Sequence, residues 1–204
     1  MNNHSAFLCS LFFVLVFAMS VPFRHAAAES LPDGGKPAVY LNETGIGSGY
    51  AWGALKGADE DMSIYPAFVR IGFNANGLFG IKSRKSILQL TIEPFVNIVS
   101  GPDDGVEAGC GFGLRYLHEV ASPVDLFVEA SVAPMYYSID TREQGAAGFN
   151  FLDQFGAGLQ YRFAPGKALF AGYRFRHISH AGLADRSNDG LNSNAIVAGF
   201  SWLY

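Results

Sequence analysis

The chain has 204 residues, with 14 Lys and Arg against 18 Asp and Glu, which gives a formal net charge of −4. It contains no basic block, so the sequence does not favour nucleic acid as a partner. Charged residues make up 16% of the chain, against about 25% in ordinary soluble domains. The 24 glycines and 18 phenylalanines are high counts for this length, so the composition argues against an ordinary water-facing surface.

Residues 1–28 are predicted to be a signal peptide. An apolar run at residues 6–21 is followed by "HAAAES", which has the small-residue pattern of a cleavage site. The run is shorter than the roughly 20 residues that a membrane helix needs. We expect cleavage after Ala28, which leaves residues 29–204 as one exported domain. Cys9 would leave with the signal peptide, so Cys110 has no disulfide partner.

The rest of the chain alternates apolar and polar residues in segments of about ten, separated by Gly, Pro, Asp and Asn clusters. This pattern predicts eight strands, at residues 44–55, 63–74, 87–100, 106–118, 125–138, 150–163, 168–179 and 192–204. The first strand shows the contrast between its faces, because Gly45, Gly47 and Gly49 alternate with Ile46 and Tyr50.

Two kinds of barrel produce this alternation: a membrane barrel with its apolar face outward, or a soluble lipocalin-like barrel with that face inward. The polar face is mostly Gly, Ala and Ser with a few charges of both signs, which suits a narrow lumen better than a wet surface. Its charged residues could pair there: Arg70, Arg115, Arg162, Arg174 and Arg176 with Glu93, Glu107 and Glu129. The last strand places Ile196, Phe200, Trp202 and the terminal Tyr204 on one face, as in bacterial outer-membrane barrels that end on an aromatic residue. We therefore predict an all-β, eight-stranded antiparallel up-and-down transmembrane β-barrel in the bacterial outer membrane.

The seventh strand carries two polar residues on its apolar face. His177 and Ser179 share the side of Tyr173 and Phe175, whereas Arg174 faces the lumen. The short links "ASPVD" and "APGK" are predicted periplasmic turns, so the stretch after the seventh strand lies outside the cell. An imidazole two strand residues from a hydroxyl can act as its general base. The alternative is that both residues are interfacial groups that mark the end of the hydrophobic band.

The end of the chain resembles a known enzyme family. "HISHAG", then "NDGLN" and a closing aromatic strand, is similar to the outer-membrane lipid A 3-O-deacylases of the PagL type, whose motif is HxSNAG, an N-x-G turn and the last strand. The resemblance is specific over residues 173–204. It implies Ser179 as nucleophile and His177 as general base, with an acid at the start of the last strand. It also implies lipid A, or lipopolysaccharide, in the outer leaflet as the substrate.

The chain departs from that motif in two places. His180 stands where the family has Asn, and Asn192 stands where characterised enzymes have Glu. An amide oxygen can orient the imidazole, but it cannot stabilise imidazolium by charge. Asp185 or Asp189 could supply a carboxylate instead, although such residues more often serve turn formation.

Other groups are candidates for the same site. His180 could substitute as the base, but its parity directs it toward the lumen or the loop. The backbone amides of Ala181 and Gly182 could form an oxyanion hole. The acidic loops "GADEDM" and "GPDD" could bind divalent cations, although such charge runs are usually solvated. No catalytic metal ligands and no cofactor motif are recognisable, and Cys110 is expected to be inert packing in the lipid-facing surface.

These observations favour an esterase that releases the 3-hydroxyacyl chain at position 3 of lipid A, with Ser179, His177 and Asn192 as the site and no cofactor. The alternative is a weakly active or inactive outer-membrane barrel with a structural or lipid-binding role.

Overall fold

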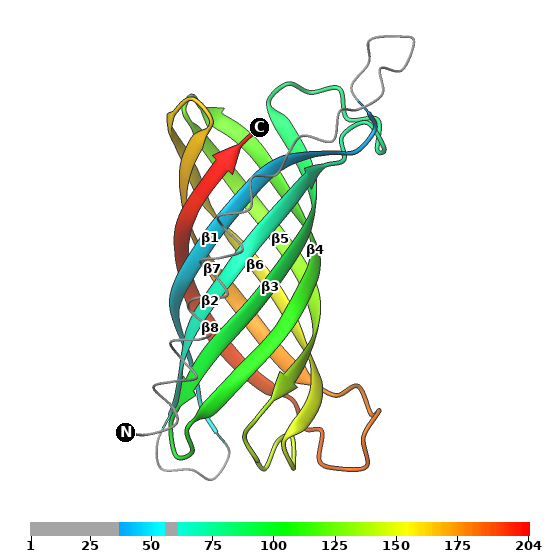
Figure 1. Ribbon diagram of the computed structural model, residues 1–204, viewed down its shortest axis with the longest axis vertical. Helices are drawn as coiled ribbons and strands as arrows, with labels where there is room; N and C mark the ends of the chain where they lie inside the picture. The colour runs from blue at the N-terminus through cyan, green and yellow to red at the C-terminus, as the bar shows by residue number, and fades with distance from the viewer. Residues whose placement is uncertain (1–36, 56–60) are drawn as a thin grey trace, which may run out of the picture. The chain divides into compact units, whose positions relative to one another are not determined.

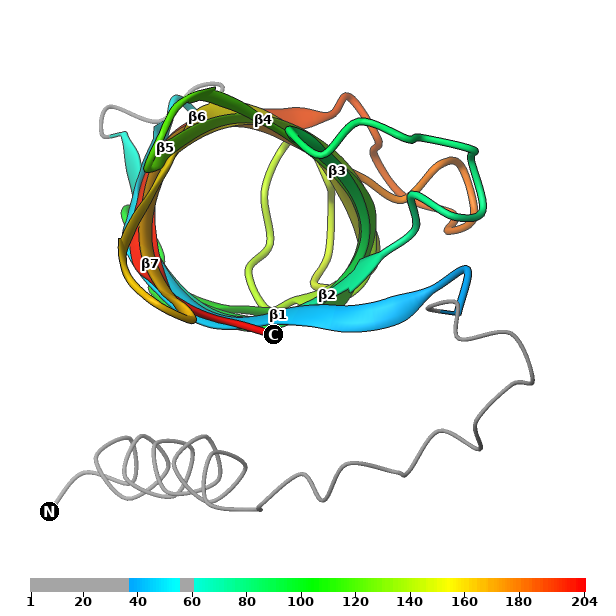
Figure 2. The same ribbon diagram turned by 90° about the horizontal axis from the view of Figure 1, so that it is seen from above.

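The computed structural model describes residues 37–55 and 61–204. These residues form eight strands: β1 (Tyr40–Gly53), β2 (Met62–Asn74), β3 (Ser86–Ser100), β4 (Gly105–Ala121), β5 (Val124–Tyr137), β6 (Gly148–Ala164), β7 (Lys167–Ser179) and β8 (Leu191–Leu203). Each strand pairs with the next, and β1 pairs with β8, so the sheet closes into an antiparallel barrel (Figures 1 and 2). The predicted fold class is confirmed. The expected signal peptide lies outside the described residues.

The strand boundaries differ most from the prediction where the alternation is interrupted. β1 begins at Tyr40, four residues before the predicted start at 44, and β4 continues to Ala121 instead of ending at 118. A register shift lies between Leu41 and Glu43 in β1, and another between Glu119 and Ala121 in β4. Such bulges add a residue to one strand and break the period-two pattern on which the prediction relied. The described residues contain no helix with the length and apolar character to span a membrane.

The outer face of the barrel is apolar, and the lumen holds the buried charged and polar side chains together with a hydrophobic cluster that includes Phe68, Phe127 and Phe170. In β7, Tyr173 and Phe175 are 46% and 38% exposed, whereas Arg174 and Arg176 are only 5% and 2% exposed. The apolar face therefore points away from the lumen, as predicted for a membrane barrel. A lipocalin-like barrel with its apolar face inward is contradicted by this arrangement.

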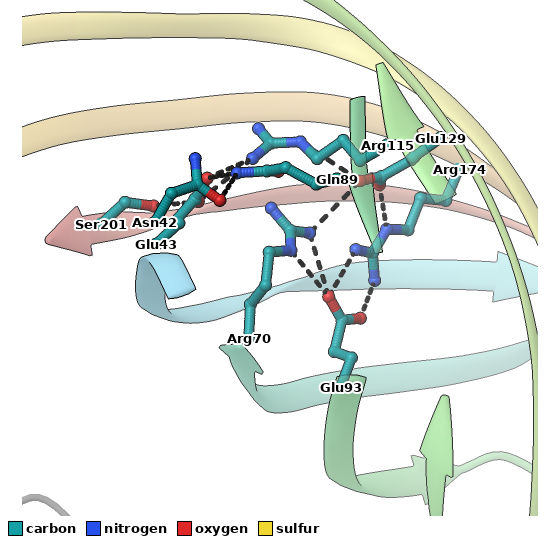
Figure 3. Close-up of polar contacts among 9 residues, drawn as sticks. All are labelled: Asn42, Glu43, Arg70, Gln89, Glu93, Arg115, Glu129, Arg174 and Ser201. Atoms are coloured by element: carbon teal, nitrogen blue, oxygen red, sulfur yellow. Dashed lines mark hydrogen bonds and ion pairs between the residues drawn. The ribbon is translucent and has the colours of Figure 1, made fainter. Parts of the chain in front are cut away.

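Carboxylates in the lumen each bind more than one arginine and so join strands across it (Figure 3). Glu93 accepts hydrogen bonds from Arg174 Nη1 at 2.6 Å and from Arg70 Nη2 at 3.0 Å. Glu129 lies between the same two arginines, at 2.7 Å from Arg174 Nε and 3.3 Å from Arg70 Nη2. Buried charges are stable only when they are paired and hydrogen-bonded, and this cluster meets that condition from four strands at once.

A second group of contacts joins β1 to strands across the lumen. Glu43, which is fully buried, accepts hydrogen bonds from Arg115 Nη1 at 3.1 Å and from Ser201 Oγ at 2.6 Å. Gln89 Nε2 also donates to it, at 2.9 Å. The sequence prediction missed this residue, because it placed Glu43 before the first strand.

The two remaining arginines that were predicted to face the lumen, Arg176 and Arg162, differ in their partners and in their exposure. Arg176 pairs with Glu107, and both are buried. Arg162 does not join the buried cluster as expected. It pairs with Glu119 at a half-exposed site near the β6–β7 turn instead, so the predicted role of four of the five arginines is confirmed.

The Glu93 cluster generates a stability prediction. Replacement of Glu93 by Gln leaves Arg70 and Arg174 short of one buried counter-charge, which should cost about 3–5 kcal/mol of unfolding free energy. Glu119→Gln is the matched control, because it breaks a half-exposed pair worth about 0–1 kcal/mol. Denaturant unfolding of the barrel in lipid vesicles, followed by the heat-dependent shift in gel mobility, measures both. Equal losses for the two variants would contradict the central role of Glu93.

Candidate active site

His177 and Ser179 lie on the outward face of the last three residues of β7. Ile178, between them, points into the lumen and is fully buried. Both polar side chains are half-buried and follow Tyr173 and Phe175 along the same face. The predicted orientation of the pair is therefore confirmed. It results from the alternation of β7, whose inward residues Arg174 and Arg176 are held by carboxylates in the lumen.

Asn192 faces His177 from the neighbouring strand. The two residues are directly opposite each other in the β7–β8 register. His177 Nδ1 and Asn192 Oδ1 are 2.7 Å apart. An amide oxygen can only accept, so Nδ1 carries the proton in this hydrogen bond and Nε2 keeps its lone pair. The imidazole is thus oriented with its basic nitrogen available.

Gly190, two residues before Asn192, lies against the imidazole ring. A Cβ atom at this position would come within 2.5 Å of His177 Cε1. Its φ of +79° is also in the left-handed region that glycine tolerates best. The glycine of the "NDGLN" stretch therefore both turns the chain into β8 and leaves room for the histidine ring.

Ser179 is close to His177 along the strand but is not hydrogen-bonded to it. Its register partner is Phe151 of β6. Among the residues that the structure describes, the Ser179 hydroxyl has no hydrogen-bond partner. A serine hydroxyl rotates freely about its Cβ–Oγ bond, and the His177 ring has its Nε2 free. The two groups share one face but would need a rotamer change to meet.

A tight turn follows the serine. The Leu183 amide donates to the His180 carbonyl at 2.9 Å, and both central residues, Ala181 and Gly182, have positive φ angles of 53° and 74°. These are the features of a type I′ turn. In the described part of the chain, neither central amide has a hydrogen-bond acceptor. Both amides are therefore available to an external oxygen.

His180 serves this loop and is not available as a base. Its side chain is 1% exposed, and Nε2 lies 3.0 Å from the Ser187 carbonyl oxygen. Its Nδ1 accepts from the Ala184 amide at 3.4 Å, while its own amide donates to Asn188 Oδ1 at 2.9 Å. Both ring nitrogens are engaged, so the structure gives His180 a role in holding the loop.

The connection from β7 to β8 is clamped to the connection from β5 to β6. Arg186 donates to the carbonyl oxygens of Gln144 and Phe149, each at 2.6 Å, and also to that of Ala146. Gln144 Nε2 in turn donates to the Ile178 carbonyl oxygen at 3.1 Å. The β5–β6 connection crosses the end of the lumen (Figure 2). The clamp therefore ties the residues around His177 to a fixed part of the barrel, and the sequence alone did not indicate it.

The surface beside the site is mainly apolar and aromatic on β6, β7 and β8. Its exposed side chains are Phe149, Phe155, Tyr173, Phe175 and Ile196, which range from 38% to 61% exposed. An exposed apolar area of this kind indicates contact with lipid or with another apolar partner.

Other predicted features do not contribute to this site. No set of three or more His, Cys, Asp or Glu side chains suited to a metal ion occurs within the described residues. Of the acidic loops, part of "GADEDM" lies outside the described residues, and in "GPDD" Asp104 accepts a hydrogen bond from Ser100 Oγ at 2.9 Å. Cys110 is a half-buried free thiol on β4.

Comparison with known proteins agrees with the motif and the fold. Residues 38–201 match the family model described as lipid A 3-O-deacylase (PagL). The crystal structure of the outer membrane enzyme PagL is 18% identical, with a TM-score of 0.51 over 77% of this chain and 97% of that chain. Neisserial surface protein A is 16% identical, with a TM-score of 0.57 over 83% of this chain and 99% of that chain. No curated protein matches the sequence. The family match spans most of the chain and includes the β7–β8 site, so this outer-membrane barrel belongs to the lipid A 3-O-deacylase (PagL) family.

Proposed function

We propose that the protein hydrolyses the ester bond at position 3 of lipid A and releases the 3-hydroxyacyl chain. The observation that carries this proposal is the hydrogen bond between His177 Nδ1 and Asn192 Oδ1, at 2.7 Å, on the outward face next to Ser179. That bond leaves the basic Nε2 of His177 on the same face as an unpaired hydroxyl. Family membership supplies the substrate class.

The proposed reaction is acyl transfer through serine. Ser179 Oγ attacks the ester carbonyl carbon while His177 Nε2 takes the hydroxyl proton. The tetrahedral oxyanion would accept hydrogen bonds from the free amides of Ala181 and Gly182. The C–O bond to the sugar then breaks, and His177 returns the proton to the departing sugar oxygen. Water, deprotonated by the same Nε2, attacks the acyl-serine carbonyl carbon. The bond from that carbon to Ser179 Oγ breaks, His177 returns the proton to Oγ, and the fatty acid is released.

The position of the site suits a substrate that stays in the membrane. The reacting groups face outward at one end of β7, beside the exposed side chains of Tyr173 and Phe175. An acyl chain could lie along this apolar surface while its ester reaches Ser179. A water-soluble ester would gain nothing from an active site on the lipid-facing side of a barrel.

A second candidate function rests on Asn192. A neutral amide orients His177 but adds no negative charge, so a barrel that binds lipid A without hydrolysing it is the alternative. The two functions predict different lipid products. Mass spectrometry of lipid A from cells that produce the protein distinguishes them, because hydrolysis removes one 3-hydroxyacyl chain.

The first functional prediction concerns Ser179→Ala. Nucleophilic catalysis cannot proceed without the hydroxyl, so release of the 3-hydroxy fatty acid should cease. The barrel should stay folded, since no hydrogen bond of this hydroxyl would be lost. Mass spectrometry of lipid A and gel mobility of unheated samples give the two readouts. Equal deacylation by wild type and variant would rule out Ser179 as nucleophile, and no activity in either would favour the lipid-binding alternative.

The second prediction concerns Asn192→Glu. An acid-to-amide change in a serine protease costs about 10⁴ in turnover, so an enzyme that uses Asn here should be slow. A carboxylate beside Nδ1 should raise the rate by stabilising imidazolium. Deacylation rates of purified protein in mixed micelles test this. Asp185→Asn and Asp189→Asn are the controls, because loss of activity in either, with no gain in Asn192→Glu, would assign the acid's role to the loop.

The third prediction uses two glycines with similar backbone angles. Gly190→Ala places a Cβ 2.5 Å from His177 Cε1, which should push the imidazole away from Asn192 and lower the deacylation rate. Gly80→Ala, in the connection between β2 and β3, has a similar φ of +66° but meets nothing within 4 Å, so it measures the cost of backbone strain alone. Steady-state rates for both variants make the comparison. A deacylation rate that Gly190→Ala lowers no more than Gly80→Ala does would show that ring packing on Gly190 is unimportant.

A further inference from the structure

A carboxylate lies on the outward face of β6, directly across from His177. Asp153 is the register partner of His177 in the β6–β7 pair. His177 is in turn the register partner of Asn192 in the β7–β8 pair. The three residues therefore form one row across three neighbouring strands, with the histidine in the middle.

No other contact explains a carboxylate at this position. Its outward neighbours on β6 are apolar: Phe149, Phe151, Phe155 and Leu159. Asp153 is half-buried, and in the described part of the molecule it has no hydrogen bond or ion pair. An ionisable side chain on the lipid-facing side of a barrel is costly and usually indicates function.

The register pairing places Asp153 within side-chain reach of the histidine. Directly opposed residues of antiparallel strands have Cβ atoms about 4.5–5.5 Å apart, which is within reach of an Asp and a His side chain. The effective dielectric constant beside lipid is lower than that of water, so charges at this distance interact strongly. The histidine becomes positively charged when it takes the proton of Ser179.

We propose that Asp153 supplies the negative charge that stabilises the His177 imidazolium, while Asn192 orients the ring. The two tasks that one acid performs in a Ser-His-acid triad are then divided between residues on either side of the histidine. Asp153 acts through His177 and is a positioning residue. This inference rests on the proposed deacylase function.

The surroundings of His177 leave few other sources of that charge. The outward residues on β8 near it, Asn192 and Asn194, are neutral. Its neighbours on its own strand, Phe175 and Ser179, carry no charge at neutral pH. The carboxylates of the adjoining loop, Asp185 and Asp189, have exposed side chains, and the amide variants at these two positions test their contribution.

Kinetics of Asp153→Asn test the role in catalysis. We expect kcat to fall about 10- to 100-fold with little change in KM, because the lost interaction exists only when His177 is charged. The acidic limb of the pH–rate profile should move to lower pH, since a histidine without the neighbouring charge protonates less readily. Asp153→Glu should restore most of the rate. Asp104→Asn, which removes a loop carboxylate between β3 and β4, is the matched control and should leave the rate unchanged.

A double variant separates electrostatics from a structural effect. In the Asn192→Glu background a carboxylate already adjoins His177, so Asp153→Asn should cost less than it does in the wild type. The same loss in both backgrounds would show that Asp153 acts independently of the charge on His177, and would overturn the proposal.

A measurement without substrate keeps this inference distinct from the deacylase proposal. In Ser179→Ala protein with isotope-labelled histidine, NMR follows the protonation of the His177 ring, with His177→Gln for assignment. Asp153→Asn should shift the titration midpoint to lower pH, whereas Asp104→Asn should not. An unchanged midpoint in Asp153→Asn overturns the inference whatever the enzyme does. A shifted midpoint together with intact lipid A in cells supports the electrostatic pairing and refutes the proposed function.

Discussion

The orientation of the outward side chains of β7 depends on the buried ion pairs of the lumen. Glu93 and Glu129 bind Arg70 and Arg174 from four different strands, and Glu107 holds Arg176. A slip of β7 by one residue would turn Arg174 and Arg176 toward lipid and leave these carboxylates unpaired. Two arginines on the lipid face of one strand would each cost about 2–4 kcal/mol near the bilayer midplane. The same ion pairs therefore determine that His177 and Ser179 face the membrane.

The candidate site has an unusual division of roles. In a Ser-His-acid triad the acid both orients the imidazole and balances its charge. Here Asn192 contacts Nδ1 at 2.7 Å and can perform only the first of these tasks. Asp153 lies on the other neighbouring strand, β6, in the same cross-strand row. A β-sheet makes such a division simple, because the histidine of a central strand has a neighbour on each side.

Two side chains of the β7–β8 loop, Arg186 and His180, hold the site in place. Arg186 binds three backbone carbonyl groups of residues 144–149. His180 uses both of its ring nitrogens within its own loop. These contacts determine where the chain enters β8, and hence where Gly190 and Asn192 lie relative to His177. A lipid-facing site has no enclosing pocket, so a rigid framework at the strand ends is what keeps its groups together.

The sequence by itself determined the barrel class and the facing of most residues. Period-two alternation depends only on the extended backbone, so the pattern alone indicates that His177, Ser179 and Asn192 share the outward side. The motif around them indicates the family. Alternation could not locate the bulges at Leu41 and Glu119, because an extra residue interrupts the period-two pattern where the strand continues, and it therefore missed Glu43 as a lumen carboxylate.

Only the tertiary structure decided which residues of different strands are neighbours. Register is a property of strand pairs, and no spacing within one strand shows that Asp153 lies opposite His177. The same holds for the Arg186 clamp, since it joins two loops that are separated along the chain by the whole of β6 and β7. The sequence could identify side chains suited to acyl transfer. The closed barrel placed Asp153, His177 and Asn192 in one row across three strands, and so supplied the carboxylate that the motif lacks.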